Sequence, residues 1–226
     1  MAVMDEFREE REQIKTAPLP KKIQYFKDYY LIPTLFTVFV VTVAVLVLKS
    51  TIFRREESLY VCMVNFAAAE EAEENVTEAF EKKALSDKKD YIVVDSNTYI
   101  AVDEEESDLI KYSYVDEEKL LAMVMSGSLD FLASGQDVVE RYMEQDWFDD
   151  LSGILDPDLL RKLEEEDRIL YKGSVPVAVS LDGSALVTGN FEYRGKKGEA
   201  LYGGFPAGSQ RRELAARFLD FLLGEP

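Results

Sequence analysis

The hydrophobic residues of this chain form one long uncharged run, followed by short segments in which strand and helix patterns alternate. From residue 31 to residue 48 the sequence LIPTLFTVFVVTVAVLVL holds eighteen residues without a charge, and Lys49 follows it. At a helical rise of about 1.5 Å per residue this run reaches about 27 Å, close to the hydrocarbon thickness of a bilayer. Because Ile52 and Phe53 lengthen the run if Lys49 snorkels, we predict a transmembrane helix over residues 31–53 that contacts the lipid bilayer.

The basic residues that flank this run predict its orientation. Six of them precede it and three follow before residue 82, namely Arg8, Arg11, Lys15, Lys21, Lys22 and Lys27, then Lys49, Arg54 and Arg55. By the positive-inside rule the N-terminus is expected in the cytoplasm. A cleavable signal peptide has a shorter apolar core at the very start of the chain. We therefore predict an uncleaved signal anchor in the cell membrane, single-pass, with the C-terminal domain extracytoplasmic.

Residues 1–30 are predicted to form a cytoplasmic tail. Pro18 and Pro20 interrupt any continuous helix, which leaves two short helices. In the second, which is amphipathic, aromatic residues recur every three or four positions beside lysines. Such a pattern is typical of an anchoring collar at the membrane interface. The aromatic residues are Tyr25, Phe26, Tyr29 and Tyr30.

Residues 56–226 are predicted to form one extracytoplasmic, acidic α/β domain. Its first half predicts strands over residues 58–66, 91–96 and 129–133, and helices over residues 67–85, 117–127 and 135–148. Whether residues 98–105 extend the second strand or form another stays open. Strands that alternate with helices favour one compact lobe, with a mainly parallel mixed sheet flanked by helices.

The second half of this domain has more strand patterns and ends in a helix. Strands are predicted over residues 168–173, 175–181, 185–193 and 199–206, separated by glycine-containing turns. Residues 209–223 predict the final helix, with Ser209 as its cap. Its apolar face consists of Leu214, Phe218, Phe221 and Leu222.

Charge and residue usage narrow the classes of function. Of the formal net charge of −18, the domain beyond residue 55 carries −21, from 17 basic and 38 acidic residues. A domain of this charge repels phosphates, so no nucleic acid partner is expected. The chain has no histidine, which removes the commonest general base, histidine-based triads and most zinc sites, and no enzyme activity is expected. The lone Cys62 lies in an apolar run and is expected to be a buried small hydrophobe.

One stretch of the domain resembles a known family of binding proteins. Residues 126–164 read SGSLDFLASGQDVVERYMEQDWFDDLSGILDPDLLRKLE, and residues 204–223 read GFPAGSQRRELAARFLDFLL. Both are similar to segments of bacterial extracytoplasmic solute-binding proteins of ABC importers, in which a strand leads into a helix, an aromatic turn and Asp-Leu-Ser. Those family members have two lobes with the ligand between them, whereas this chain has room for about one. The resemblance implies a reduced solute-binding-like lobe.

The whole layout also resembles another group of proteins. The opening MDEFREEREQIK, the YFKDYY before the apolar run and the acidic domain after it are similar to small single-span membrane proteins of Gram-positive anaerobes. Those proteins carry a short extracytoplasmic domain of unassigned role.

Candidate ligand-binding residues follow from the position of the predicted strands. In open α/β sheets ligands favour the carboxyl ends of strands. These ends, with one aromatic turn, supply Asn65, Ser96, Asn97, Ser134, Gly135, Gln136 and Trp147. Residues 134–136 lead into a helix N-terminus whose N–H groups suit a small anion or carboxylate, the alternative being an ordinary cap and turn. Trp147 suits stacking on a sugar or peptide ring, the alternative being a buried hydrophobic turn.

No metal or cofactor is expected. The aspartates between residues 146 and 158 lack the glycine-containing twelve-residue loop of a calcium site, which favours a solvated surface. We therefore predict a non-catalytic, membrane-anchored binding or interaction module, whose partner is a small solute or another membrane protein. The alternative is an accessory or structural subunit of a membrane complex that binds no small molecule.

Overall fold

The computed structural model describes residues 17–52, 56–85, 89–101 and 107–224, and it divides the chain into two compact units. The first unit comprises residues 1–54 and the second residues 55–226. Each unit is described by itself below. The first of the two helices predicted in the N-terminal tail lies outside the described residues.

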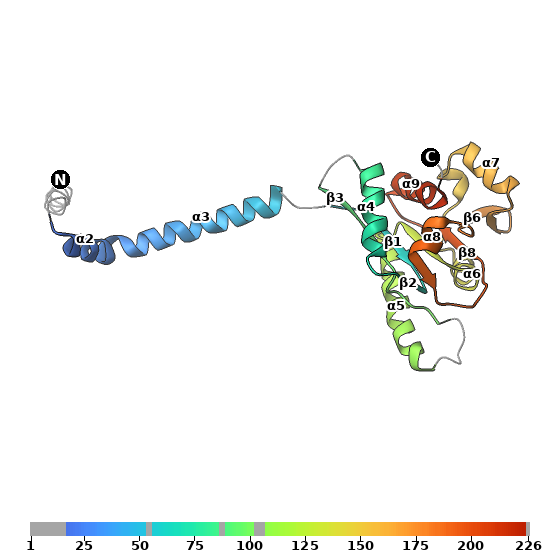
Figure 1. Cartoon of the computed structure of the whole chain (residues 1–226), viewed down its shortest axis with the longest axis horizontal. Helices are drawn as coiled ribbons and strands as arrows, with labels where there is room; N and C mark the ends of the chain where they lie inside the picture. The colour runs from blue at the N-terminus through green and yellow to red at the C-terminus, as the bar shows by residue number, and fades with distance from the viewer. Residues whose placement is uncertain (1–16, 53–55, 86–88, 102–106, 225–226) are drawn as a thin grey trace. The chain divides into compact units, whose positions relative to one another are not determined.

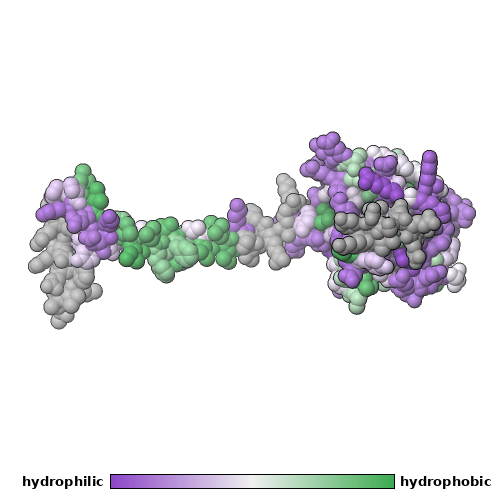
Figure 2. Space-filling view, turned by 90° about the horizontal axis from the view of Figure 1, so that it is seen from below, coloured by the Kyte–Doolittle hydropathy of each residue, from purple (hydrophilic) through white to green (hydrophobic). Residues whose placement is uncertain are grey.

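The described part of the first unit is helical throughout residues 19–52, and its C-terminal part is apolar. It consists of α2 (Leu19–Tyr25), a π-helical turn η1 (Phe26–Tyr30) and α3 (Leu31–Ile52). The 22 residues of α3 extend about 33 Å, and none of the apolar span is buried within the protein. Figure 2 shows an apolar surface along α3. The length and composition of this helix suit a membrane span, and a signal sequence has the same two properties.

The π-helical turn stacks several aromatic rings just before the span. The ring of Tyr25 lies 4.8 Å from that of Tyr29 and 5.8 Å from that of Tyr30. The turn ends three residues before Pro33, which has no backbone N–H to donate to the preceding turn of the helix. A local change to π-helical bonding is a known way to absorb such a missing donor.

The second unit is built on a mixed sheet of six strands in the order β3-β1-β4-β8-β6-β5. Their bounds are β1 Glu56–Met63, β3 Asp90–Asp95, β4 Phe131–Gly135, β5 Ile169–Lys172, β6 Val175–Ser180 and β8 Leu201–Gly204. Strand β1 runs parallel to β3 and β4. The pairs β4–β8, β8–β6 and β6–β5 are antiparallel. The prediction of an α/β fold is confirmed, but the prediction of a mainly parallel sheet is wrong for its C-terminal half, where β5 and β6 form a hairpin.

Helices cover both faces of this sheet, and a two-stranded ribbon lies apart from it (Figure 1). The helices are α4 Ala72–Ala84, α5 Ser107–Ser126, α6 Gln136–Glu144, η2 Leu151–Gly153, α7 Pro157–Glu165, α8 Ala185–Asn190 and α9 Arg212–Leu223. The ribbon pairs β2 (Phe66–Ala68) with β7 (Phe191–Tyr193) in antiparallel register.

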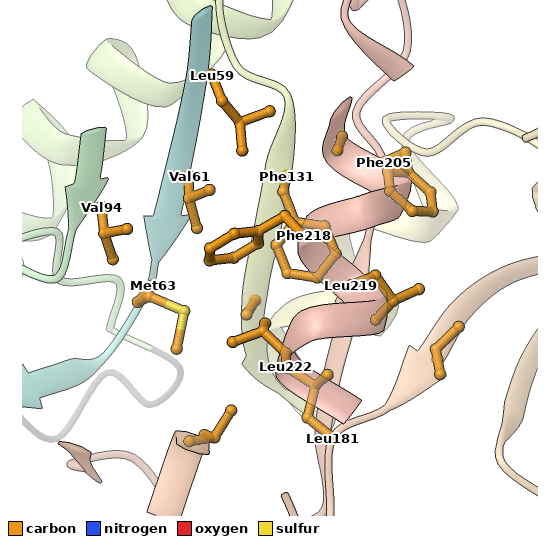
Figure 3. Close-up of a cluster of buried hydrophobic side chains, with 14 of the residues drawn as sticks. Leu59, Val61, Met63, Val94, Phe131, Leu181, Phe205, Phe218, Leu219 and Leu222 are labelled. Carbon is orange, nitrogen blue, oxygen red and sulfur yellow. The ribbon is translucent and has the colours of Figure 1, made fainter. Parts of the chain in front are cut away.

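The core lies on both faces of β1, because alternate residues of a strand point to opposite sides. Leu59, Val61 and Met63 join a large cluster with α4, α7, α8 and α9. Cys62 and Val64 join a second cluster with α5 and α6. Figure 3 shows residues of the first cluster packed between the sheet and α9. A strand buried on both faces explains the continuous apolar run of its sequence.

Three predicted elements differ in the structure. The predicted strand 58–66 divides at Asn65, whose φ of 61° breaks the extended chain between β1 and β2. Residues 185–190, predicted as strand, form α8, because the Ser184 hydroxyl accepts a hydrogen bond from the Val187 N–H and caps the helix. Residues 98–101 are in neither strand nor helix, and residues 102–105 of that open alternative lie outside the described residues.

The cap predicted for the final helix is also wrong in detail. Helix α9 begins at Arg212, and its N-cap residue Arg211 makes no capping side-chain bond. Ser209 instead donates to the buried Asp130 carboxylate at 2.6 Å and accepts from the Arg211 N–H at 3.1 Å. Ser209 thus joins the start of α9 to the segment just before β4. The predicted apolar face of α9 is confirmed, since Phe218 and Leu222 are buried and Leu214 and Phe221 pack against them.

Substitution of Phe218 by alanine should destabilise the domain strongly. The Phe218 ring lies 5.1 Å from that of Phe80 on α4 and 5.8 Å from that of Phe131 on β4, and it is fully buried. Removing it leaves a cavity between helix and sheet, which costs about 3–5 kcal/mol in the free energy of unfolding. Urea denaturation measures this loss. In contrast, Tyr114→Ala on the exposed side of α5 should stay within about 0.5 kcal/mol of the parent; equal losses would contradict the packing described here.

Candidate functional site

The carboxyl edge of the parallel strands divides into two neighbourhoods. The chain passes from β1 through α4 to β3 on one side, and then through α5 to β4 on the other side of β1. This reversal makes the carboxyl ends of β1 and β4 a topological switch point, where α/β proteins commonly place ligands. Six of the seven predicted residues lie at or beside the ends of β1, β3 and β4. They belong to two separate groups.

The first group is the N-terminus of α6, and a carboxylate of the chain itself occupies it. Oε1 of Glu199 accepts a hydrogen bond from the Asp137 N–H at 2.5 Å. Oε2 of the same residue accepts one from the Tyr193 hydroxyl at 2.9 Å. The Gln136 N–H donates to the Ala200 carbonyl at 2.9 Å. The helix N-terminus that was predicted to hold a small anion or carboxylate therefore holds Glu199.

Gly135 makes room for this internal carboxylate. A Cβ atom at this position would collide with the Tyr193 hydroxyl and come within 2.5 Å of the Glu199 carboxyl carbon. Burial, and then the hydrogen bond to Glu199, raise the pKa of Tyr193 above its ordinary value. The phenol therefore stays protonated and can donate to Glu199 at neutral pH.

The other predicted residues of this group have structural partners as well. Ser134 is fully buried and donates to the Val64 carbonyl at 3.0 Å, across β4 and β1. The Gln136 side chain donates to Glu140 one turn along α6 at 2.6 Å. The alternative of an ordinary cap and turn describes residues 134–136 better than a ligand site does.

The second group lines a hollow of about 410 Å³ beyond the ends of β1 and β3. We call it the β1–β3 hollow. Its lining includes three predicted residues, Asn65, Ser96 and Asn97, and it also includes Glu73, Thr98 and Arg194. Its remaining wall comes from Tyr99 and the β2 segment. The structure thus brings together candidates that lie 31 and 32 positions apart in the sequence.

Two of the predicted residues build the wall of the β1–β3 hollow. Asn65 donates from Nδ2 to the Ile100 carbonyl at 2.8 Å and accepts from the Ile100 N–H at 2.7 Å. Ser96 donates to Oε1 of Glu73 from its N–H at 2.9 Å and from its hydroxyl at 2.5 Å. Both side chains are buried. Asn97 is exposed to solvent.

A cluster around Asp95 holds the same wall against α5. Asp95 accepts hydrogen bonds from Tyr60, from Lys119 on α5 and from the Asn97 N–H, at 2.8, 2.7 and 2.9 Å. Burial alone would raise the pKa of Asp95, but these hydrogen bonds lower it below its ordinary value. The ionised carboxylate therefore holds the turn at residues 95–97 in place.

Arg194, like Glu73 and Thr98, lines the β1–β3 hollow but was not among the residues that the sequence indicated. Its backbone N–H donates to the Asn65 carbonyl at 2.7 Å, which ties the end of β7 to the end of β1. Its side chain is exposed, and within the described part of the chain its guanidinium has no ion pair or hydrogen bond. The signal was present but weak, since Arg194 begins the basic turn RGKK of an otherwise acidic domain.

Trp147 lies in the core, away from both groups. Its ring stacks on that of Tyr142, with centroids 4.1 Å apart and planes within 9° of each other. Only 7% of Trp147 is exposed. The alternative of a buried hydrophobic turn therefore describes Trp147, and its ring is not available to stack on a sugar.

The reactivity of the cysteine and the grouping of metal-ligating side chains can be judged from the described residues. Cys62 is fully buried, and burial raises the pKa of its thiol to about 12, so the thiol is not a nucleophile at neutral pH. Within the described ranges no three His, Cys, Asp or Glu side chains gather as metal ligands do.

Comparison of the chain with protein-family models, with curated proteins and with solved structures finds no match. The resemblance to solute-binding proteins and the resemblance to single-span proteins of Gram-positive anaerobes therefore stay predictions.

Removal of the internal carboxylate should loosen the start of α6. We expect Glu199→Ala to lower the free energy of unfolding by about 1 kcal/mol, the usual effect of losing a helix cap, because the Asp137 N–H loses its acceptor. Hydrogen exchange should be faster at the Asp137 amide than in the parent. Glu192→Ala, an exposed acidic residue of the neighbouring β7, is the matched control and should change neither quantity. Unchanged exchange at Asp137 in Glu199→Ala would contradict the capping role.

Proposed function

We propose that this chain is a single-span membrane protein whose residues 56–226 form a non-catalytic binding module outside the cytoplasm. The observation that carries the proposal is the β1–β3 hollow, a polar concavity beside a topological switch point. The arginine at its rim has no side-chain partner among the described residues. Its volume of about 410 Å³ falls within the range of small-molecule sites. The ligand is a small solute.

The anchor part of the proposal rests on α3 and on the charges around it. The helix is long and apolar enough to cross a bilayer. The six basic residues before the span and three after it support an orientation with the N-terminus inside. An uncleaved anchor of this kind takes the place of the lipid tether or free diffusion that solute-binding proteins use.

The binding part of the proposal fits a lobe reduced to one sheet. The switch-point position that suits an anion is filled by Glu199, so a solute has to bind on the β3 side of β1 instead. There the wall is rigid, because Asn65, Ser96 and Asp95 are each held by hydrogen bonds. A preformed wall reduces the entropy lost on binding.

A second candidate function is favoured by one specific observation on α5. Tyr114, Leu121 and Met125 are spaced by seven and four residues, which places them on one face of the helix, and they are 65%, 44% and 81% exposed. Val115 beside them is also exposed. Exposed apolar faces often mark protein interfaces, which favours an accessory subunit that contacts another membrane protein and binds no small molecule.

A ligand screen separates these two functions. We expect the thermal unfolding midpoint of the full-length chain in detergent to rise with at least one member of a panel of sugars, amino acids, small carboxylates and short peptides. A ligand at a hundred times its Kd stabilises the folded state by about 2.7 kcal/mol. Addition of the same compounds to an unrelated single-span protein in the same detergent controls for effects on the detergent alone. If no compound of the panel raises the midpoint, solute binding is wrong and the accessory role is favoured.

The orientation has its own test. Protease added to intact cells should digest the acidic domain and leave the N-terminal tail protected, because the basic residues hold that tail inside. An epitope tag at each end of the chain reports which part survives. Loss of the N-terminal tag, with the C-terminal tag retained, would reverse the proposed topology.

A further inference from the structure

We infer that the β1–β3 hollow binds a small solute with a single carboxylate group, and that Arg194 is the residue that pairs with this carboxylate. The inference deepens the proposed function and rests on it, because it names the class of solute for the same hollow.

The two charged side chains of the hollow, Glu73 and Arg194, differ in how many hydrogen bonds they already make. Glu73 already accepts two hydrogen bonds from Ser96 on the same oxygen. Arg194 has no side-chain partner among the described residues. A guanidinium presents its N–H donors as a planar fork that matches the two oxygens of a carboxylate. The charged side chain of the β1–β3 hollow that is available to a ligand is therefore one that suits a carboxylate.

The position of Arg194 is fixed by its backbone rather than by its side chain. Its N–H is bonded to the Asn65 carbonyl, and the preceding Tyr193 is bonded to Glu199 and packs its ring 5.2 Å from that of Phe66. The Cα of Arg194 is thus held at the rim of the hollow, while its guanidinium pairs with none of the described residues. Such a residue can bind a ligand without breaking an existing ion pair.

Local charge also favours an anion at this rim, although the domain as a whole is acidic. Arg194, Lys196 and Lys197 place three basic residues within four positions, in a domain that has 17 basic and 38 acidic residues. Lys196 is paired with Asp137 at 3.5 Å, so part of its charge is used at the α6 N-terminus. Charges farther away than about 8 Å are largely screened at physiological salt, so the nearest cations dominate.

The charge balance favours a carboxylate over a phosphate. One arginine compensates one negative charge, and Glu73 lies on the wall of the same hollow. A phosphate with a charge near −2 would keep an uncompensated charge close to this glutamate. The remainder of the solute faces neutral groups, including the exposed Asn97 and the backbone of β2.

The test compares matched ligands and matched variants of the full-length chain in detergent. The probes are propionate, lactate and N-acetylalanine, each with its neutral primary amide, and inorganic phosphate. Affinity is measured by titration calorimetry and by the thermal midpoint. At least one carboxylate should bind more tightly than its amide, and Arg194→Ala should weaken that binding about ten- to a hundredfold.

Two further variants test whether the loss of affinity is specific to the guanidinium of Arg194. Lys197→Ala removes an exposed cation of the same turn that does not line the hollow, and it should leave the affinity unchanged. Arg194→Lys should give an intermediate affinity, because it keeps the charge and loses the fork. The unfolding midpoints of the ligand-free Arg194 variants should match the parent, since the guanidinium makes no hydrogen bond or ion pair with the described residues.

Each other outcome overturns a defined part of the argument. No binding by the three carboxylates, tighter binding of phosphate, or equal losses in Arg194→Ala and Lys197→Ala would overturn the inference. If a neutral sugar or amide binds and the affinity persists in Arg194→Ala, the carboxylate inference fails while the binding function stands. If no compound of the wider panel binds, both fail.

Discussion

The hydrogen bonds of Asn65 hold together the region on which the hollow depends. Its N–H donates to Thr98, its carbonyl accepts from Arg194, and its side-chain amide bonds the Ile100 backbone in both directions. One residue therefore ties the end of β1 to the segment after β3 and to the end of β7. Asparagine suits this position because it tolerates the left-handed backbone, here with a φ of 61°, and carries both a donor and an acceptor.

The two neighbourhoods at the carboxyl edge differ, because a side chain of the protein fills one and leaves the other open. Residues of the β7–β8 connection contribute to both. At one end of this connection Arg194 lies at the rim of the β1–β3 hollow, with no side-chain partner among the described residues. Near its other end Glu199 fills the N-terminus of α6. The peptide dipoles of α6 are thus satisfied inside the domain, and under the proposed function the positive charge of the same connection pairs with a solute. A free anion is expected at the arginine rather than at the helix.

Local sequence patterns predicted several elements. The strand β1 and the helices α4 and α9 follow from the spacing of hydrophobic residues that are buried in the domain, and the long helix α3 follows from its uncharged run. The antiparallel half of the sheet was not predicted, because the pairing of β4 with β8 joins segments about 70 residues apart and leaves no local signal. Helix α8 was missed for a related reason: its β-branched residues resemble a strand, and its cap Ser184 is held by the Leu222 carbonyl of α9.

The sequence predicted residues of the candidate site only where they follow the end of a predicted strand. Strand ends identified Asn65, Ser96 and Asn97, which do meet in the hollow. The same rule also selected Ser134 and Gln136, because the sequence does not reveal that Glu199, 62 residues beyond Asp137, supplies the carboxylate. Arg194 was not predicted because the hydrogen bond that holds its backbone at Asn65 joins residues far apart in the sequence and leaves no local signal.

A hollow on a single lobe limits how a solute can be held. In a two-lobed protein a second domain closes over the ligand and removes it from water, whereas the β1–β3 hollow keeps one side of its occupant solvated. Hydrogen bonds between neutral groups contribute little net free energy when water competes for them. Binding under these conditions would depend on a charged, bidentate contact and on a wall that is already ordered. In the proposed function Arg194 supplies the contact, and the hydrogen-bonded Asn65 beside it supplies the wall.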